Sequence, residues 1–289
     1  MSTAPRCAND PTILGILNLT SDSFSDGGKF LDVAAALTHA EALVRGGADA
    51  IDVGAQASNP TAIEVSVDEE VARLTPVVTA LKRRDVAVSV DTFRPAVMRA
   101  MLALGADYIN DICGFVDADA IPAVRDANTK LIVMHAVHTS RRGAGDFVAA
   151  RAEPLDSDVA TIVARVEGWL RMRVNELLAN GIHRDRLILD PGMGFFLGRE
   201  PLLSVEVLRQ LPRLAAIGLP LLVSVSRKSF VGALLADDDA NVPPPHERSI
   251  GTLAAEAFAV ARGATYVRTH EPAALREFLR VQRALDDKK

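Results

Sequence analysis

Eight short apolar runs, separated by stretches with helical periodicity, constrain the fold of this chain more than any other feature. The runs are rich in β-branched residues and almost uninterrupted, as expected for parallel strands that are covered on both faces. Between them, apolar residues recur with the i, i+3, i+4, i+7 spacing of a helix that buries one stripe, as in 74–81 and 163–177. The expected strands lie at residues 13–17, 50–53, 86–90, 108–112, 131–134, 187–189, 221–225 and 266–269.

Eight βα units in a chain of 289 residues predict a (β/α)8 TIM barrel, for which about 250 residues is typical. No linker or change of composition divides the chain, so residues 1–289 are expected to form a single α/β domain. A doubly wound sheet is the alternative architecture. It usually carries a GxGxxG nucleotide-binding loop after its first strand, and this sequence has none.

Three of the expected helix-to-strand joints share one pattern: a helix ends, Gly-Ala and a polar residue follow, and a strand begins. They are 46–52, 104–111 and 262–269, and glycine is expected to end each helix in the left-handed conformation. The strand-to-helix connections are longer, which predicts an active site at the C-terminal ends of the strands. These long connections are 19–31, 54–67, 136–156 and 191–200, with an insertion at 237–247.

Composition narrows the class of protein. With 49% hydrophobic and 24% charged residues, the chain has the composition of an ordinary soluble globular protein. Its net charge of −5 argues against a nucleic-acid-binding surface, which needs a strongly basic face. Cys7 and Cys113 are too few for a disulfide framework or a zinc site. The N-terminal residues lack a signal-peptide core and no apolar run approaches the ~20 residues of a membrane span, so we expect a cytoplasmic protein without membrane contact.

Polar or ionisable side chains lie at or near the end of every expected strand. Residues in these positions of a barrel point at one shared cavity, and eight strands that end in this way are hard to explain by solvation alone. The sequence therefore predicts a binding site lined by Asn18, Asp52, Asp91, Asn110, His135, Asp190, Lys228, Arg268 and His270.

The residue types divide this site in two. Acceptors come from two aspartates and an amide and a donor from a lysine, which together suit a flat, neutral heterocycle with several N–H groups and one carbonyl. This group consists of Asp91, Asn110, Asp190 and Lys228. The second group lies on strands that are neighbours once the barrel closes, and it combines an amide with two groups that are or can become cationic. It suits phosphate oxygens and a magnesium ion, and consists of Asn18, Arg268 and His270.

Some of these residues have plainer explanations. Asp52 could cap the following loop, and Asp91 and Asp190 could each be a helix N-cap, for which aspartate is common. Lys228 could extend into solvent. A histidine in the position of His135 is more often a packed core residue than a catalyst.

Seven motifs resemble those of the dihydropteroate synthases and occur in order along nearly the whole chain. The resemblance implies a TIM barrel, usually dimeric, that uses Mg²⁺. It implies condensation of 6-hydroxymethyl-7,8-dihydropterin diphosphate with p-aminobenzoate to 7,8-dihydropteroate, with release of pyrophosphate. The motifs are GILNLTSDSFSDGG (15–28), SVDTF (89–93), YINDI (108–112), LIVMH (131–135), LILDPGMGF (187–195), SVSRKSF (224–230) and YVRTHE (266–271).

The resemblance also assigns roles, motif by motif. It implies that catalysis depends on Asp91, Asp190 and Lys228. It implies a pterin site made of Asp91, Asn110, Met134, Asp190, Lys228 and Arg268. It implies that the diphosphate binds Asn18, Arg268 and His270, with Asn18 also a ligand of the metal. It implies a p-aminobenzoate site made of Phe24, Ser58, Asn59, Pro60, Phe195, Phe196 and Ser229.

Two departures from the family pattern fall around the p-aminobenzoate site. The second loop of the family usually reads Glu-Ser-Thr-Arg-Pro and here reads Gln-Ala-Ser-Asn-Pro (56–60), so Asn59 replaces a cation. The usual Gly-Phe-Gly-Lys becomes the longer Gly-Phe-Phe-Leu-Gly-Arg (194–199). These features resemble the sulfonamide-resistant synthases, and an added aromatic side chain can exclude the bulkier drug while admitting the flat carboxylate. We therefore expect a sulfonamide-insensitive enzyme of the antibiotic-resistance type.

Two other functions stay open on the sequence. A barrel of the methyltetrahydrofolate methyltransferase type would share Asp91, Asn110 and Asp190, but it has no use for the SRKS motif or for a diphosphate site at Arg268 and His270. A non-catalytic pterin-binding homologue would explain the departures around p-aminobenzoate, but a binding protein would not need the diphosphate residues.

Overall fold

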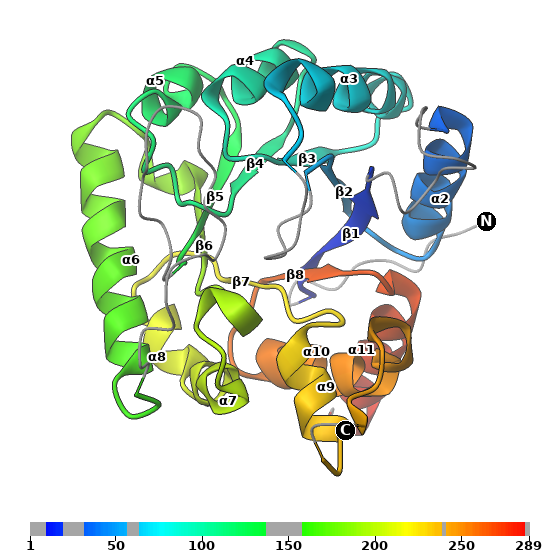
Figure 1. The fold of residues 1–289 in the computed structure, drawn as a ribbon, viewed down its shortest axis with the longest axis vertical. Helices are drawn as coiled ribbons and strands as arrows, with labels where there is room; N and C mark the ends of the chain where they lie inside the picture. The colour runs from blue at the N-terminus through cyan, green and yellow to red at the C-terminus, as the bar shows by residue number, and fades with distance from the viewer. Residues whose placement is uncertain (1–9, 20–31, 57–63, 137–157, 239–240, 287–289) are drawn as a thin grey trace.

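In the computed structural model, eight parallel strands form a barrel that is surrounded by helices (Figure 1). The structure describes residues 10–19, 32–56, 64–136, 158–238 and 241–286. The predicted fold class is confirmed, and each expected run overlaps one strand. The strands are β1 (Thr12–Asn18), β2 (Ala50–Gly54), β3 (Val88–Asp91), β4 (Tyr108–Asp111), β5 (Lys130–Met134), β6 (Leu187–Asp190), β7 (Leu222–Val223) and β8 (Tyr266–Thr269).

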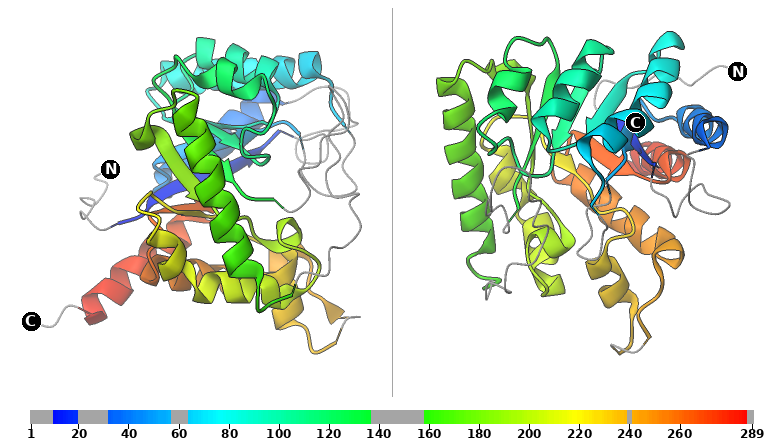
Figure 2. Two further views of the ribbon diagram at one scale, coloured as in Figure 1. Left: turned by 90° about the vertical axis from the view of Figure 1, so that its left-hand side faces the viewer. Right: turned by 45° about the horizontal axis from the view of Figure 1, so that its top comes forward.

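The helices form the outer ring of the barrel, which the turned views also show (Figure 2). The α-helices are α2 (Val33–Arg45), α3 (Val67–Arg83), α4 (Pro95–Ala103), α5 (Ala120–Val124), α6 (Ile162–Ala179), α7 (Pro201–Arg209), α8 (Leu211–Ala215), α9 (Ser229–Leu235), α10 (Ser249–Ala261) and α11 (Pro272–Asp286). Short 3₁₀ helices are η1 (Arg184–Arg186), η2 (Gly194–Phe196) and η4 (Pro245–Glu247). The apolar stripes predicted within 74–81 and 163–177 face the core, because all their apolar members are buried in α3 and α6. Past the helix ends, Gly47, Gly105 and Gly263 have positive φ, as the repeated joint predicts.

The barrel closes at its weakest point between β6 and β7. The strands follow the order β6-β5-β4-β3-β2-β1-β8-β7, and closure consists of one bridge between Leu189 and Leu221, with N–H of Leu189 donating to O of Pro220 at 2.8 Å. The predicted strand 221–225 is therefore regular only over two residues. The strand is followed by a turn in which O of Val225 accepts from N of Lys228, at 3.1 Å.

An apolar layer fills the barrel and forms the floor of its mouth. Its members come from all eight strands or from the residue just before them, and two of its rings, Tyr108 and Tyr266, meet edge to face with centroids 6.4 Å apart. The layer consists of Leu14, Ala50, Ile132, Ile188 and Leu222, with Ala87, Tyr108 and Tyr266 packed against them. Because side chains alternate with period two along a strand, the next inward positions lie directly above this floor. They are Ile16, Asp52, Ser89, Asn110, Met134, Asp190, Ser224 and Arg268.

Candidate active site

Neighbouring strands bring four of the predicted pterin residues to the mouth of the barrel. In the ladders of β2, β3 and β4, Gly54 pairs with Asp91 and Asp91 pairs with Asn110. A Cβ on Gly54 would lie 3.3 Å from Cβ of Asp91, so glycine leaves room for the carboxylate. Further round the barrel, Met134 of β5 pairs with Asp190 of β6.

Arg268 connects two carboxylates across the mouth. Nε of Arg268 donates to Oδ2 of Asp52, and its Nη2 donates to Oδ2 of Asp91 at 2.9 Å. Since β1 separates β8 from β2 in the sheet, the contact with Asp52 crosses the barrel interior. Nδ2 of Asn110 also donates to Oδ2 of Asp52, at 3.5 Å. Asp52 is fully buried, and the structure gives it the role of a counter-ion of Arg268, for which the sequence offered no signal.

Two buried oxygen atoms of this cluster accept no hydrogen bond from the described residues. They are Oδ1 of Asp52 and Oδ1 of Asn110. Buried polar atoms without a partner are rare in proteins, and each such atom calls for an explanation. Donors on a ligand seated on the apolar floor would supply the missing partners.

Burial moves the charged groups of the site toward neutrality. Desolvation raises the pKa of Asp91 to about 7, although the nearby Arg268 guanidinium lowers it. Desolvation also raises the pKa of Asp190 to about 6, with Lys228 acting in the opposite sense. Desolvation lowers the pKa of Lys228 to about 8. These groups therefore change protonation within the range in which enzymes work, as catalytic groups often do.

Glycine-containing turns fix Asp190 and Lys228. Oδ1 of Asp190 accepts from N of Gly192 at 2.7 Å. Gly192 has φ +71°, and a Cβ there would lie 2.1 Å from O of His135, so only glycine fits. Nζ of Lys228 donates to O of Met193 at 3.0 Å. The Lys228 side chain is thereby held beside Asp190 and does not extend freely into solvent.

The predicted diphosphate residues differ in their surroundings. Nδ1 of His270 shares a hydrogen bond with Oγ of Ser226 at 2.9 Å, and N of His270 donates to the same oxygen at 3.2 Å. Burial, with the cations Arg227 and Arg268 nearby, lowers the pKa of His270 to about 3. His270, which the sequence suggested could become cationic, is therefore a neutral ring that can form hydrogen bonds. Asn18 ends β1 and is exposed.

Apolar side chains line one side of the mouth. A buried cluster of Ile112, Met134 and Ala136 has Phe93, Cys113 and Phe196 packed against it. The Phe196 ring also lies below Lys228, with Nζ 4.8 Å from the ring centroid, and the Phe195 ring stacks beside it at 4.1 Å with an angle of 32°. Such a wall beside carboxylates suits a flat heteroaromatic ring.

His135 and Asp111 support the fold near the site. His135 is 2% exposed and packs edge-on against Trp169, with centroids 5.3 Å apart, and burial lowers its pKa to about 4. It is a packed core histidine. Asp111, which sequence reasoning did not single out, accepts from N of Cys113 and N of Phe115, at 2.7 Å each, and so shapes the turn after β4.

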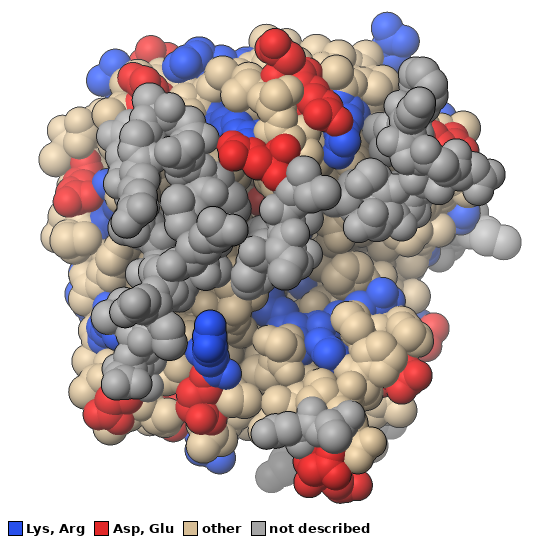
Figure 3. Space-filling model, viewed as in Figure 1, with Lys and Arg blue, Asp and Glu red and all other residues tan. Residues whose placement is uncertain are grey.

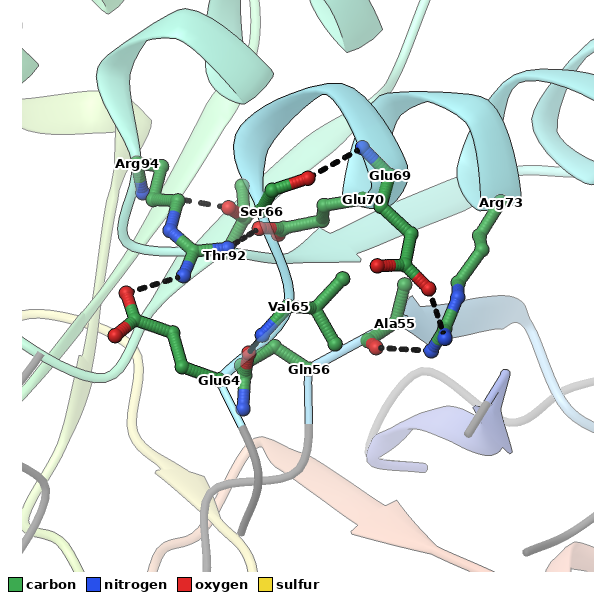
Figure 4. Close-up of polar contacts among 10 residues, drawn as sticks. All are labelled: Ala55, Gln56, Glu64, Val65, Ser66, Glu69, Glu70, Arg73, Thr92 and Arg94. Carbon is green, nitrogen blue, oxygen red and sulfur yellow. Dashed lines mark hydrogen bonds and ion pairs between the residues drawn. The ribbon is translucent and has the colours of Figure 1, made fainter. Parts of the chain in front are cut away.

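A polar network that sequence reasoning missed lies at the start of α3 (Figure 4). Oε1 of Gln56 accepts from N of Val65 at 2.7 Å. Arg94, in the turn after β3, donates from Nη1 to Glu70 at 2.5 Å and from Nη2 to Glu64 at 3.0 Å. Glu70 is fully buried. It follows two other acidic residues in the first turn of the helix, where acidic residues are common. The sequence therefore did not distinguish Glu70 from an ordinary exposed residue.

The p-aminobenzoate residues are only partly described. Phe24, Ser58, Asn59 and Pro60 lie outside the described residues. Ser229 begins α9, and its Oγ is 3.7 Å from the place that a Cβ on Gly194 would occupy. The described residues therefore place Ser229 against η2, the turn that carries Phe195 and Phe196.

Both signs of charge reach the face onto which the barrel opens. Figure 3 shows Asp or Glu atoms above, and Lys or Arg atoms below, the middle of this face.

Within the described ranges, no three His, Cys, Asp or Glu side chains are grouped to hold a metal ion. None of the helices in those ranges is long and apolar enough to cross a bilayer.

Comparisons with known proteins agree on one family. The model of the family "Pterin binding enzyme" matches residues 14–270. "Dihydropteroate synthase type-3" of Escherichia coli is 42% identical over 274 residues, which cover 94% of this chain and 98% of the relative. The structure of Xanthomonas albilineans dihydropteroate synthase with 4-aminobenzoic acid is 36% identical, has a TM-score of 0.84, and is matched over 97% of this chain and 94% of that one. The same enzyme in complex with 7,8-dihydropteroate is 35% identical with a TM-score of 0.81, over 97% and 95% of the two chains.

Proposed function

The chain belongs to the pterin-binding enzyme family, and to the dihydropteroate synthases within it, and from that premise we propose that it joins 6-hydroxymethyl-7,8-dihydropterin diphosphate to p-aminobenzoate. The observation that carries the proposal is the cluster of Asp52, Asp91 and Arg268 with Asn110 above an apolar floor. It offers largely buried acceptors to a ring beside a largely buried cation.

The pterin ring is proposed to lie against the wall that includes Met134, with its N–H groups directed at carboxylates. Asp91, Asn110 and Asp190 would accept from the ring, and Lys228 would donate to its carbonyl. The unpartnered Oδ1 of Asn110 supports this pose. A ring N–H that donates to a carboxylate favours the ionised form, so binding would lower the raised pKa values of Asp91 and Asp190.

Catalysis would then be mostly electrostatic. The bond between the pterin methylene carbon and the diphosphate oxygen breaks, and its electron pair leaves with the diphosphate. The cation left on the pterin is stabilised by Asp91 and Asp190. The amine nitrogen of p-aminobenzoate attacks with its lone pair and then loses a proton to solvent. Fixed charges in a site closed to water act more strongly than in bulk, and one such group is worth roughly 10²–10³ in rate.

The diphosphate is proposed to bind Arg268, His270 and Asn18 with a magnesium ion. Arg268 is already paired with Asp52 and Asp91, and His270 is neutral, so these residues alone leave the diphosphate charge largely uncompensated. Mg²⁺ commonly binds through one or two protein oxygens together with waters and phosphate oxygens, and the exposed amide of Asn18 fits that requirement. The ion would neutralise charge on the departing pyrophosphate.

p-Aminobenzoate is proposed to lie between Ser229 and the η2 turn, with Phe24, Ser58, Asn59 and Pro60 completing its site. In this position Phe195 and Phe196 would exclude sulfonamides. The packing of the two rings on each other and of Phe196 on the apolar wall supports a rigid obstacle. A thousandfold discrimination corresponds to about 4 kcal/mol, which a steric clash with a fixed ring can supply.

A homodimer is also proposed, with 1–289 as one domain in each copy. Apolar side chains of α11 are exposed on one face at i, i+3 and i+7: Phe278 by 39%, Val281 by 60% and Leu285 by 81%. Exposed apolar patches of this kind mark contacts between proteins. In size-exclusion chromatography with light scattering, the wild type is expected to be dimeric and Val281→Glu monomeric. A monomeric wild type would remove the proposal.

The decisive experiment measures pyrophosphate release from the pterin diphosphate with and without p-aminobenzoate, in magnesium. Release is expected to depend on p-aminobenzoate and to produce 7,8-dihydropteroate. Asp190→Asn should lose at least a hundredfold in kcat, whereas Asp126→Asn, at a side chain 94% exposed, should match the wild type. Pterin binding without release would identify a binding protein, and methyl transfer without pyrophosphate would identify the other enzyme class.

A further inference from the structure

The buried face of α10 carries a polar stripe where a helix against a barrel normally carries apolar residues. Arg248, the residue directly before α10, is followed at four-residue spacing by Thr252 and Glu256, and the three are 9%, 1% and 1% exposed. Residues four apart lie on one face of a helix, and buried polar groups are costly unless they form hydrogen bonds. The bonds of this stripe therefore indicate what it does.

All three side chains bind the two segments that carry Lys228 and Arg268. Oγ1 of Thr252 accepts from N of Arg227 at 3.0 Å. Nη1 of Arg248 donates to O of Arg227 at 2.9 Å. Glu256 shares a hydrogen bond with the side chain of Thr269, the residue after Arg268 in β8.

Arg227 is a residue that needs such support. Its φ of 58° lies in the left-handed region, which is unfavourable for any residue other than glycine. Its side chain explains why it is not a glycine, because Nη2 donates to Oε1 of Glu271 at 2.9 Å, where Oγ of Ser249 also donates at 2.9 Å. Thr252 of α10 thus holds the backbone of Arg227. Ser249, the first residue of α10, binds the carboxylate of Glu271 that also binds the Arg227 side chain.

Arg248 also links the turn to the preceding segment. Its Nε donates to O of Pro243 at 2.8 Å, in the insertion that the sequence showed at 237–247. The guanidinium lies on Gly232 of α9, where a Cβ would be 2.6 Å from Nε. Arg248 is therefore enclosed between the insertion, α9 and the turn that presents Lys228.

We propose that Arg248 and Thr252 are positioning residues for Lys228, because they hold the strained backbone of Arg227, the residue directly before Lys228. The catalytic role of this positioning rests on the proposed synthase activity, whereas the hydrogen bonds that hold the turn do not depend on it. The two hydrogen bonds fix the backbone N–H and the backbone carbonyl of Arg227. Without them the turn relaxes, and Nζ of Lys228 leaves O of Met193 and the neighbourhood of Asp190.

Two matched variants separate positioning from stability. Thr252→Val keeps the shape of the side chain and removes the acceptor for N of Arg227, whereas Thr252→Ser keeps the acceptor. Thr252→Val is expected to lose at least tenfold in kcat/KM for the pterin diphosphate, and Thr252→Ser to stay within threefold of the wild type. Gly232→Ala, which displaces Arg248 without removing a polar group, should act like Thr252→Val. Ala254→Ser, on the exposed face of α10, should have no effect.

A second readout does not depend on activity. Lysines labelled by reductive ¹³C-methylation are titrated by NMR, and the Lys228 signal, identified by its loss in Lys228→Arg, is expected to have a midpoint near pH 8 in the wild type. In Thr252→Val it should move upward, toward the ordinary 10.5, because a displaced lysine is better solvated; Thr252→Ser should keep the wild-type midpoint. An unchanged midpoint in folded Thr252→Val, or equal effects of valine and serine, would overturn the proposal. A wild type that releases no pyrophosphate refutes the proposed function only, and the titration then decides this inference.

Discussion

Replacing Arg268 by methionine would leave two carboxylates at the mouth of the barrel without their shared cation. Asp52 is fully buried and Asp91 has a side chain 15% exposed, while that of Arg268 is 16% exposed. Breaking a buried ion pair by removing one partner typically costs about 3–5 kcal/mol. Because Arg268 keeps some contact with water, we expect the lower end, about 3 kcal/mol of unfolding free energy at pH 8.

The expected loss depends on pH in a defined direction. The pKa of Asp91 in the folded protein is about 7, raised from 3.8, and it would rise further without Arg268. A carboxyl group with a raised pKa favours the folded state while it is protonated, and this contribution disappears as pH increases through the folded pKa. The deficit of Arg268→Met should therefore be smaller at pH 5 than at pH 8.

Thermal unfolding at the two pH values measures both effects. At roughly 2.1 cal/mol/K per residue, a chain of 289 residues has an unfolding entropy of about 0.6 kcal/mol/K, so a loss of about 3 kcal/mol should lower the melting temperature by about 5 °C at pH 8. Adding Asp52→Asn to Arg268→Met removes one of the two carboxylates that lost their cation, and should recover part of the lost stability. A variant that melts within 2 °C of the wild type at pH 8, or whose deficit is the same at pH 5, would refute the argument.

Three further predictions concern the site. The value of kcat/KM for the pterin diphosphate should decrease at pH values below an apparent pKa of 6–7, as the carboxylates are protonated, and at pH values above about 8, as Lys228 loses its proton. Steady-state rates from pH 5 to 10 test this, and Lys228→Arg should remove the decrease at alkaline pH. Phe195→Ala should lower the inhibition constant of a sulfonamide at least tenfold while changing KM for p-aminobenzoate less than threefold, and equal inhibition would contradict the assigned obstacle. Gly192→Ala, with a Cβ only 2.1 Å from a carbonyl oxygen, should melt several degrees lower and bind pterin more weakly in calorimetry, because the turn holds Asp190.

The sequence was sufficient for the barrel and for most of its rim because both depend on periodicity. Runs typical of parallel strands recur eight times. Because the C-terminal ends of such strands meet at one mouth of the barrel, the polar residue at each end is expected to lie there. Asp91, Asn110 and Asp190 lie at or near strand ends for this reason. The length of β7 could not be predicted, because closure of the barrel between β6 and β7 depends on a single bridge and not on apolar character.

Partnerships across the barrel were beyond sequence reasoning. Arg268 and Asp52 are 216 residues apart in the chain, and nothing in either motif marks the other as its counter-ion. Arg248 and Thr252 could have been noticed as polar residues at helical spacing, but their partner is the backbone of Arg227, which leaves no trace in side-chain type. The neutral state of His270 likewise follows from burial and neighbouring cations, which appear only when the chain is folded.

The charges of the site lead to one more prediction. Three carboxylates, Asp52, Asp91 and Asp190, face two cations, Arg268 and Lys228, and the raised pKa values mean that the free site retains a proton near pH 6.5 for part of the time. A pterin ring that donates N–H groups to these carboxylates favours their ionised forms, so binding should release protons. Calorimetry of pterin binding at pH 6.5, in two buffers with different ionisation enthalpies, is expected to show release of a substantial fraction of one proton, and less in Asp190→Asn. Proton uptake, or an exchange that Asp190→Asn leaves unchanged, would mean that the ring does not meet these carboxylates, and the cation formed in the reaction would then need another source of stabilisation.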